Sequence, residues 1–467
     1  MALRKFIGDR AFYKKVLAVA LPIMIQSGVT NLVNLLDNVM VGRLGTESMS
    51  GVSIVNQFIF IFNLMIFGAI SAAGIFTAQY HGLDDGEGER YTFRFKFLIS
   101  VMAAVLAVIV FAVLDDQLIS LFLHGEDVSG DLALTLSEGK KYLFIMLIGL
   151  VPYAVSQVYA STMRETEQTV VPMVSSVVAV LANFVLNYIL IFGKLGAPAL
   201  GVRGAAIATV ISRFAELAVL LAWGYSHKSK CRYLVGAFRS FRIPARLFAQ
   251  ISVKGLPLMA NEVFWAIAMV LRNQCYSTRG LDVVAAQNIN STIINLFNVT
   301  WMSIGASIAI IVGNLLGAGK FDEARDADRK MMAFSLTCAV GMGIVLIACS
   351  PLFPMLYNTS DSVRHLATYM MIVSAITMPF AAFAHSAYFT LRSGGRVMVT
   401  LLFDSVYMWA VVIPVCLVCA HLTGMSIYWM FIFGQTAEAL KCIFGAILLK
   451  RGDWVRQLVA DTALKGE

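Results

Sequence analysis

The sequence predicts an all-α integral membrane protein with twelve transmembrane helices, and three observations support this fold class. Of its 467 residues, 59% are hydrophobic and only 14% are charged, whereas soluble domains carry about 25% charged residues. Apolar runs of about 20 residues recur, each long enough at about 1.5 Å per residue to cross a hydrocarbon core of about 30 Å. The chain also repeats itself once, as six spans followed by six related spans.

Short polar loops separate the expected spans. The longest, 114–140 and 225–254, are too short to hold a separate folded core. Residues 1–15 lack the short apolar core and small-residue cleavage site of a removable signal, so we expect the first helix to be retained. The expected spans are 13–42, 50–79, 92–114, 141–163, 168–192, 204–224, 248–277, 285–314, 330–350, 365–390, 395–420 and 426–449.

Lysine and arginine are distributed unequally between alternate loops. One side collects most of them, including Arg239, Arg242 and Arg246, whereas the longest loop of the other side is acidic, with Asp115 and Asp116. Cytoplasmic loops carry the excess of positive charge in membrane proteins. We therefore expect both termini to be cytoplasmic and the protein to lie in the plasma (inner) membrane. Because these charges flank helices, nucleic acid is not expected as a partner.

The two halves of the chain are related in sequence. Pro22 aligns with Pro257 and, at the same offset, Gly45 aligns with Gly280. Six spans per half place both copies in the same orientation, as parallel repeats about an axis along the membrane normal, an architecture typical of secondary transporters. The predicted organisation is an N-terminal lobe at 1–224, a cytoplasmic linker at 225–247, and a C-terminal lobe with a short tail at 248–467.

Cysteine usage indicates neither disulfides nor a metal centre. The seven cysteines are scattered, mostly through apolar helices, so no disulfide framework is expected. Cys416, Cys419 and His421 could supply three metal ligands from one helix end, but no second cluster completes a four-ligand shell. We therefore expect no metal site and no cofactor.

A carboxylate lies near the end of the first expected span, in the segment LLDNVMVGRLG (35–45). An ionised aspartate near the bilayer centre costs about 2.5–3.5 kcal/mol on insertion scales. Burial alone favours the neutral acid, whereas a bound cation favours the charged form. Asp37 can therefore hold either a proton or an ion.

Three neutral polar residues are expected at the depth of Asp37. Judged from the nearest outer-loop charges, they lie with it about 9–17 Å below the outer boundary. Their amide and hydroxyl oxygens are ligands that hard cations prefer, so we predict a coupling-ion site formed by Asp37, Asn183, Asn187 and Thr209. Two alternatives remain open. The neutral residues could only join helices by hydrogen bonds, or Asp37 could pair between lobes with Arg272, which occupies the equivalent position in the second half.

Polar residues inside the second half give a weaker signal. Glu262, beside Asn261, lies about 12 Å from the inner boundary marked by Lys254, which makes both residues candidates for coupling or substrate binding. His385 can titrate near neutral pH, and the alternative is a hydrogen-bonded packing role. We expect structural roles for Asp404, Glu216 and Glu438.

Substrate selectivity leaves little trace in the sequence. The 23 methionines and 31 phenylalanines could line an adaptable apolar cleft, although most are expected to face lipid or other helices. The candidate substrate path is formed by Gln26, Gln57 and Gln157. With Asp37 and Glu262 as the main interior acids, a cationic or amphipathic organic substrate is expected.

Long motifs resemble the multidrug and toxic compound extrusion (MATE) family. They are LPIMIQSGVTNLVNLLDNVMVGRLG in the first span and MRETEQTVVPMVSSVVAVLANFVLNYILIFGKLGAPALGVRGAAIATVISR from the fourth to the sixth. The resemblance implies a V-shaped pair of six-helix bundles that exchanges an inward-moving Na⁺ or H⁺ for an organic compound. The resemblance implies that the family's cation site is formed here by Asp37, Asn183, Asn187 and Thr209. Some members have Asp at the position of Asn187, and this departure leaves Na⁺ and H⁺ coupling both open.

The resemblance covers the acids of the second half less well. Some members carry an acid in the seventh span at the position that Trp265 occupies here, about one turn after Glu262, and another acid in the tenth span, where this chain has none. The implied function is a cation-coupled multidrug antiporter, expected to be a monomer in membrane lipid with small organic substrates. The alternative is a flippase for a lipid-linked oligosaccharide of the same superfamily. No paired catalytic groups at one depth were found, so we do not expect an enzyme.

Overall fold

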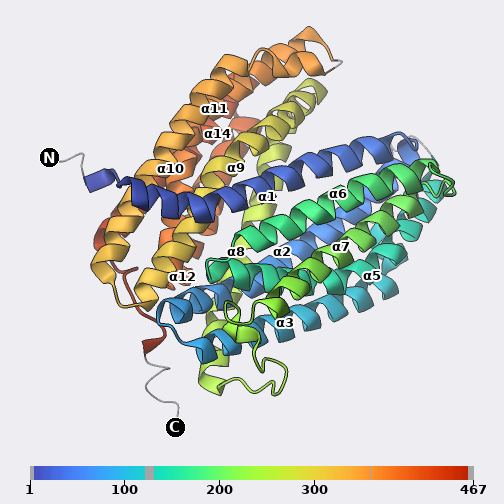
Figure 1. Cartoon of the computed structure of the whole chain (residues 1–467). Helices are drawn as coiled ribbons and strands as arrows, with labels where there is room; N and C mark the ends of the chain where they lie inside the picture. The colour runs from blue at the N-terminus through green and yellow to red at the C-terminus, as the bar shows by residue number, and fades with distance from the viewer. Residues whose placement is uncertain (1–4, 121–130, 358, 461–467) are drawn as a thin grey trace. The chain divides into compact units, whose positions relative to one another are not determined.

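The computed structural model describes residues 5–120, 131–357 and 359–460, apart from the side chains of residues 34, 35, 38, 39 and 46. Within these residues the secondary structure is helical, without strands (Figure 1). Twelve helices there are long and apolar enough to cross a membrane. The predicted all-α class and the predicted number of spans are therefore confirmed.

Six long helices form the first half of the chain, and a short helix α4 (Asp115–Ser120) follows the third span. The six are α1 (Arg10–Gly42), α2 (Thr46–Gly82), α3 (Gly86–Val113), α5 (Leu132–Glu165), α6 (Val170–Phe192) and α7 (Val202–Ser226). Short η2 (Arg232–Leu234) lies in the segment that joins the halves. The helices are generally longer than the predicted spans, because polar first and last turns continue them beyond the apolar runs.

The second half has the same number of spans, with two irregularities. Its continuous helices are α8 (Ala245–Ser277), α9 (Leu281–Gly317), α10 (Phe321–Cys349) and α11 (Asp361–Ser393), with η3 (Phe353–Leu356) before α11. The eleventh span alternates α and π turns, as α12 (Val397–Leu401), η4 (Leu402–Val406), η5 (Met408–Val412), α13 (Ile413–Leu417) and η6 (Val418–Leu422). The twelfth span is formed by α14 (Ile427–Ala439) and α15 (Lys441–Arg451).

Local sequence explains where α5 begins and why α6 and α7 approach each other closely. The side chain of Asp131 accepts a hydrogen bond from the backbone N–H of Leu134 at 3.0 Å and so caps α5. Gly204 lets α7 approach α6 closely, because a Cβ there would lie 2.5 Å from the carbonyl oxygen of Leu190. Small residues commonly allow such close helix packing in membranes. This approach brings the polar faces of α6 and α7 together.

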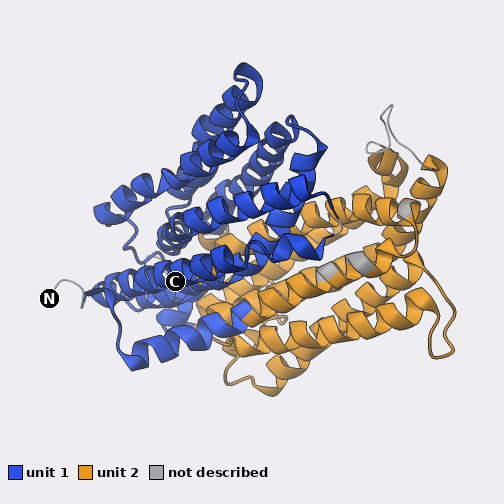
Figure 2. Cartoon of the chain, turned by 90° about the horizontal axis from the view of Figure 1, so that it is seen from above, with its two compact units in different colours: residues 1–24, 78–85, 250–467 blue, residues 25–77, 86–249 orange. Residues whose placement is uncertain are grey.

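The helices form two compact units, shown in separate colours in Figure 2. Unit 1 comprises residues 1–24, 78–85 and 250–467, and unit 2 comprises residues 25–77 and 86–249. The predicted lobes followed chain order, with a linker at 225–247. In the structure the first part of α1 and the last part of α2 instead belong with the second half, and the linker belongs to unit 2.

Hydrogen bonds account for the placement of the last part of α2 and of the linker, whereas the first part of α1 joins unit 1 by apolar packing, with Val16 and Val19 in one buried cluster with Ile308. Within unit 1, Nε2 of Gln79 donates to the carbonyl oxygen of Ser393 at 3.1 Å, and its Oε1 accepts from the backbone N–H of Leu458 at 2.6 Å. Within unit 2, the guanidinium of Arg94 on α3 donates to the carbonyl oxygens of Gly236 and Ala237 at 2.9 and 2.7 Å. These hydrogen bonds therefore tie the last part of α2 to unit 1 and the linker to unit 2.

Candidate functional site

The structure brings the four predicted coupling-ion residues together inside unit 2. Asp37 lies on α1, Asn183 and Asn187 on α6, and Thr209 on α7, and Figure 1 shows α6 and α7 side by side. Nδ2 of Asn187 donates to Oδ1 of Asp37 at 2.7 Å. Asn183 and Asn187 are 5% and 1% exposed. A carboxylate of α1 thus meets a buried polar face of α6 and α7.

The amide of Asn183 fits this cluster in two orientations. In one, its Oδ1 accepts from Nδ2 of Asn187 at 3.1 Å and its Nδ2 donates to Oγ1 of Thr209 at 3.2 Å. In the other, which satisfies both ends of the amide, its nitrogen donates to the two carboxylate oxygens of Asp37 at 2.9 and 3.1 Å, while its oxygen accepts from Thr209. The amide can therefore offer either a donor or an oxygen ligand to the space beside Asp37.

Asn187 carries an acceptor without a partner. Its Oδ1 is buried and receives no hydrogen bond within the described part of the chain. Buried polar atoms are nearly always hydrogen-bonded, so an exception next to a carboxylate calls for an explanation. A positive particle beside Asp37 would satisfy this oxygen, because hard cations bind carboxylate and amide oxygens together.

Two further residues border the cluster and were not predicted. The hydroxyl of Tyr142 on α5 contacts Thr209 and donates to Oδ1 of Asn56 at 3.3 Å. Arg213 lies one turn after Thr209 on α7, within electrostatic range of Asp37. The spacing of Thr209 and Arg213 places them on one helix face and could have revealed the arginine.

The charge of Arg213 is engaged elsewhere. Its Nη1 lies 3.5 Å from Oε2 of Glu216, and its guanidinium lies 4.6 Å from the centre of the Tyr153 ring. These contacts hold the guanidinium beside the cluster without a direct bond to Asp37 in the described hydrogen bonds. The near neighbours of Asp37 are therefore neutral amides and hydroxyls.

Arg272, the alternative partner predicted for Asp37, pairs with a different acid. Its Nη1 lies 2.5 Å from Oε2 of Glu438, within unit 1. The side chain of Arg272 is 8% exposed and that of Glu438 29%. Glu438 therefore compensates a buried guanidinium, which is the structural role predicted for this glutamate.

Asn261 and Glu262 on α8 lie next to each other in one polar cluster with Asp404. Asn261 is 1% exposed and its Nδ2 donates to Oδ2 of Asp404 at 3.1 Å, while Oδ1 of Asp404 lies 2.5 Å from Nζ of Lys441. Glu262 accepts a hydrogen bond from the hydroxyl of Tyr388 at 3.2 Å. Asn261 thus contacts Glu262 and Asp404, and Asp404 in turn pairs with Lys441, which was not predicted as part of a site.

His385 lies in an aromatic environment on α11. Its ring packs edge-on against Trp301 and Phe389, with centroid distances of 5.2 and 4.9 Å. Its carbon Cδ2 lies 2.8 Å from where a Cβ on Gly305 would stand, so α9 approaches the imidazole closely. These contacts match the packing role that remained open for this histidine.

The predicted substrate-path glutamines occupy different environments. Nε2 of Gln26 donates to Oγ of Ser176 at 2.7 Å, and Ser176 in turn donates to Oε1 of Glu216 at 3.1 Å. Gln57 is exposed on α2, and Gln157 is half-buried on α5. Gln26 thus belongs to a buried network of unit 2.

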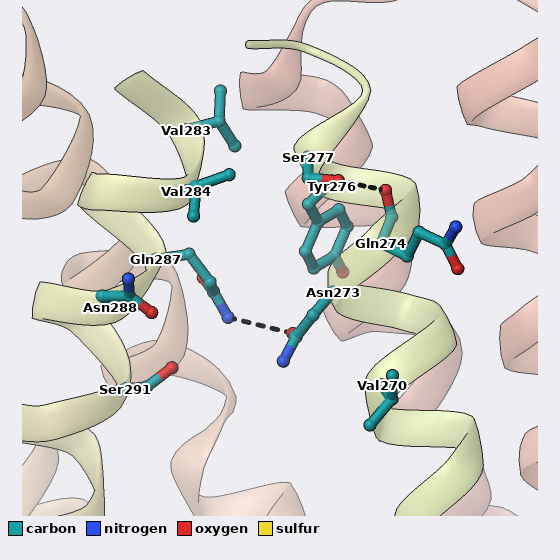
Figure 3. A pocket seen from close by; sticks show the side chains of 10 residues that line it. All are labelled: Val270, Asn273, Gln274, Tyr276, Ser277, Val283, Val284, Gln287, Asn288 and Ser291. Atoms are coloured by element: carbon teal, nitrogen blue, oxygen red, sulfur yellow. Dashed lines mark hydrogen bonds between the residues drawn. The ribbon is translucent and has the colours of Figure 1, made fainter. Parts of the chain in front are cut away.

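A pocket of about 370 Å³ lies between α8 and α9 (Figure 3). Amides and hydroxyls supply its polar lining, and none of its lining residues is charged. In Figure 3, Gln287 and Asn273 point toward each other across the pocket, with a long hydrogen bond of 3.5 Å. The lining residues are Val270, Asn273, Gln274, Tyr276, Ser277, Val283, Val284, Gln287, Asn288 and Ser291. Paired amides in each helix were visible in the sequence but were not predicted to form a site.

Comparison with known proteins gives relatives over nearly the whole chain. A probable multidrug resistance protein NorM of Thermotoga maritima is 22% identical over 452 residues, which cover 96% of this chain and 94% of that protein. The multidrug resistance protein MdtK of Yersinia pseudotuberculosis is 24% identical over 364 residues, or 78% of either chain. Both relatives are named for multidrug resistance.

Solved structures and a family profile agree with these relatives. A MATE structure in complex with MaL6 has a TM-score of 0.85 at 19% identity, covering 97% of this chain and 98% of that chain. An outward-facing multidrug resistance MATE family transporter of the MOP superfamily has a TM-score of 0.84 at 18% identity, covering 96% and 98%. The profile of the MatE family matches residues 22–189 and 257–418. The chain therefore belongs to the MatE family.

Proposed function

We propose that this protein exports organic compounds across the membrane in exchange for a cation that binds at Asp37. The observation that carries the proposal is the cluster itself, a carboxylate among neutral side-chain oxygens, in which the buried Oδ1 of Asn187 has no donor among the described residues. The names of the relatives support multidrug export. They give no support to the alternative of a lipid-linked oligosaccharide flippase.

The cluster suits either Na⁺ or H⁺. A sodium ion would bind the carboxylate of Asp37 and Oδ1 of Asn187, and the amide of Asn183 would turn its oxygen inward, as one of its two orientations allows. A proton would instead make Asp37 a donor, and an amide oxygen would accept its O–H. In both cases the cation removes the cost of a buried charge and of an unsatisfied acceptor.

Exchange requires that cation and substrate favour different states of the transporter. A ligand shifts a conformational equilibrium only by its difference in affinity for the two states. We propose that the cation binds from outside and displaces the substrate, and that its release inside allows reloading. One charge crossing 100 mV supplies about 2.3 kcal/mol, enough for roughly a fiftyfold substrate gradient.

Substrates are proposed to be cationic or amphipathic organic molecules. Asp37 and Glu262 supply acidic groups, and the pocket between α8 and α9 supplies amides and hydroxyls that suit uncharged hydrogen-bonding groups. We further propose that both termini are cytoplasmic, that the protein works as a monomer, and that its two sequence halves act as the moving lobes.

Everted membrane vesicles test the coupling proposal. A fluorescent cationic dye is offered with a Na⁺ gradient or a pH gradient, imposed separately, to the parent and to Asp37→Asn. The parent should accumulate dye with at least one gradient, and Asp37→Asn should lose that accumulation at normal expression. Asp322→Asn is the matched control, because its carboxylate lies on the surface with 98% exposure. Accumulation by Asp37→Asn at the parent rate would overturn the proposal.

A further inference from the structure

The two halves carry opposite charges at equivalent positions. The register that aligns Pro22 of α1 with Pro257 of α8 also aligns Asp37 with Arg272 and Gln26 with Asn261. Asp37 faces neutral amides, whereas Arg272 is a buried cation held 2.5 Å from Glu438. The repeat therefore places a fixed positive charge in the second half where the first half has an acid.

A second buried cation lies on the last span. Lys441 is 6% exposed, and its Nζ lies 2.5 Å from Oδ1 of Asp404 and 5.2 Å from the centre of the Phe403 ring. The other oxygen of Asp404 accepts from Nδ2 of Asn261 at 3.1 Å. Asp404 and Asp37 thus each accept a hydrogen bond from an asparagine amide. Asp404 also contacts an ammonium, and the described contacts of Asp37 include none.

The environment of Asp404 has the oxygen groups of a cation site. Oγ of Ser405 donates to both the carbonyl oxygen and Oδ1 of Asn261 at 2.7 Å, which holds these oxygens near the carboxylate. Asp404 and Ser405 lie in the π-helical turn Leu402–Val406. Such turns are rare and frequently lie at functional sites. A carboxylate, an amide and a hydroxyl converge here much as they do around Asp37.

We infer that the ammonium of Lys441 is a built-in cation at Asp404, so that the second half holds a fixed charge and the exchangeable cation binds only in the first. The inference rests on the proposed function. A tethered ammonium cannot leave, and a free ion would have to displace it from a buried pair. Glu262 borders this cluster through a hydrogen bond to Asn261 and lies in electrostatic range of Asp404, but it also bonds to Tyr388 and lies in electrostatic range of a second fixed cation, Arg392.

A purely structural ion pair makes a different prediction. Removing one partner of a buried pair is costly, whereas replacing both by apolar groups is often neutral. On that reading, a chain without Lys441 would be destabilised and no added ion would help. If Lys441 instead acts as the cation of this site, its removal leaves a cluster of oxygen atoms that lacks one positive charge. Na⁺ or methylammonium should then bind there.

The test uses purified full-length protein in the Asp37→Asn background, which removes the first-half site. We measure binding of radioactive Na⁺ and the midpoint of thermal unfolding in NaCl, methylammonium chloride or choline chloride at equal ionic strength. Lys441→Met should gain Na⁺ binding at least about tenfold above the background, with a midpoint that rises with Na⁺. Lys441→Met/Asp404→Asn and Lys441→Arg are the controls and should gain neither.

Lys441→Ala covers the case in which the methionine variant does not fold. Its smaller side chain leaves room for methylammonium, which should raise its recovery and unfolding midpoint where choline does not. The inference would be overturned if neither Na⁺ nor methylammonium affected either variant. It would also be overturned if Asp37→Asn with Lys441 intact bound Na⁺ and the added substitution Asp404→Asn abolished that binding. Failure here is distinct from failure of the proposed function, which is decided by the transport of Asp37→Asn with Lys441 intact.

Discussion

Replacement of Asn187 by alanine tests whether side-chain oxygens around Asp37 hold the cation. The change removes the buried Oδ1, which has no donor in the described structure, and the N–H that lies 2.7 Å from Asp37. The N–H can donate to the carboxylate with or without a bound cation. Its loss therefore weakens both states by a similar amount and changes the cation affinity little. Loss of the oxygen ligand acts on the cation-bound state alone and lowers the affinity for the cation.

The expected loss of cation affinity in Asn187→Ala follows from the charge of the bound cation. A hydrogen bond to a charged group is worth about 1.5–3 kcal/mol, and we assign the same range to a neutral oxygen on a monovalent cation. Since 1.4 kcal/mol corresponds to a factor of ten, Asn187→Ala should require about 10- to 100-fold more cation for half-maximal export. The dye concentration for half-maximal export at saturating cation should stay unchanged.

The assay is dye accumulation in everted vesicles at a series of cation concentrations. Gln117→Ala serves as the matched control, because it removes an exposed amide from α4, away from the Asp37 cluster and the pocket. If Asn183, Asn187 and Thr209 only join helices, the variant should lose about 0.6 kcal/mol of stability and keep its cation dependence. An unchanged half-maximal cation concentration in a well-expressed Asn187→Ala would refute the oxygen-ligand reasoning.

Three further predictions address packing, charge compensation and the pocket. Gly204→Val should disrupt the approach of α7 to α6, because a Cβ there lies 2.5 Å from a carbonyl oxygen, and should lower both the unfolding midpoint and cation-driven export. Arg272→Met should destabilise the protein by about 3 kcal/mol, since it strands the carboxylate of Glu438, and Arg272→Met/Glu438→Leu should regain most of that loss in thermal unfolding. Gln287→Ala should raise the half-maximal concentration for substrates rich in uncharged hydrogen-bonding groups and leave that of apolar cations unchanged, as measured by competition with the dye.

The depth of the candidate site was accessible from the sequence because distance along a helix converts directly into distance through the membrane. Asp37, Asn187 and Thr209 were assigned to one layer from their spacing to loop charges, and the structure brings them together. Depth does not determine which face of a helix each residue occupies. The contact of Tyr142 with Thr209 therefore emerged only from the packing of α5 against α7.

Buried charges were the hardest feature to predict. Lys96 lies near the start of the expected span 92–114, and in the structure it is buried and pairs with Glu165. Its Nζ also bonds to Ser161 and Thr162 at 3.3 and 3.2 Å. The pairing joins α3 to α5, which are far apart in sequence. Such partners depend on tertiary packing, and no local pattern of charges indicates them.

The contrast between Asp37 and Arg272 gives the repeat a physical meaning. Duplication supplies two similar scaffolds, but an exchangeable cation is useful only where a buried acid lacks a permanent partner. In unit 2, amides and hydroxyls solvate Asp37 without neutralising it, while in unit 1 the acids Glu438 and Asp404 each meet a tethered cation at 2.5 Å. Because an ion can shift the equilibrium only where its binding differs between states, coupling would then depend on one half and the other would serve as an electrostatically closed scaffold.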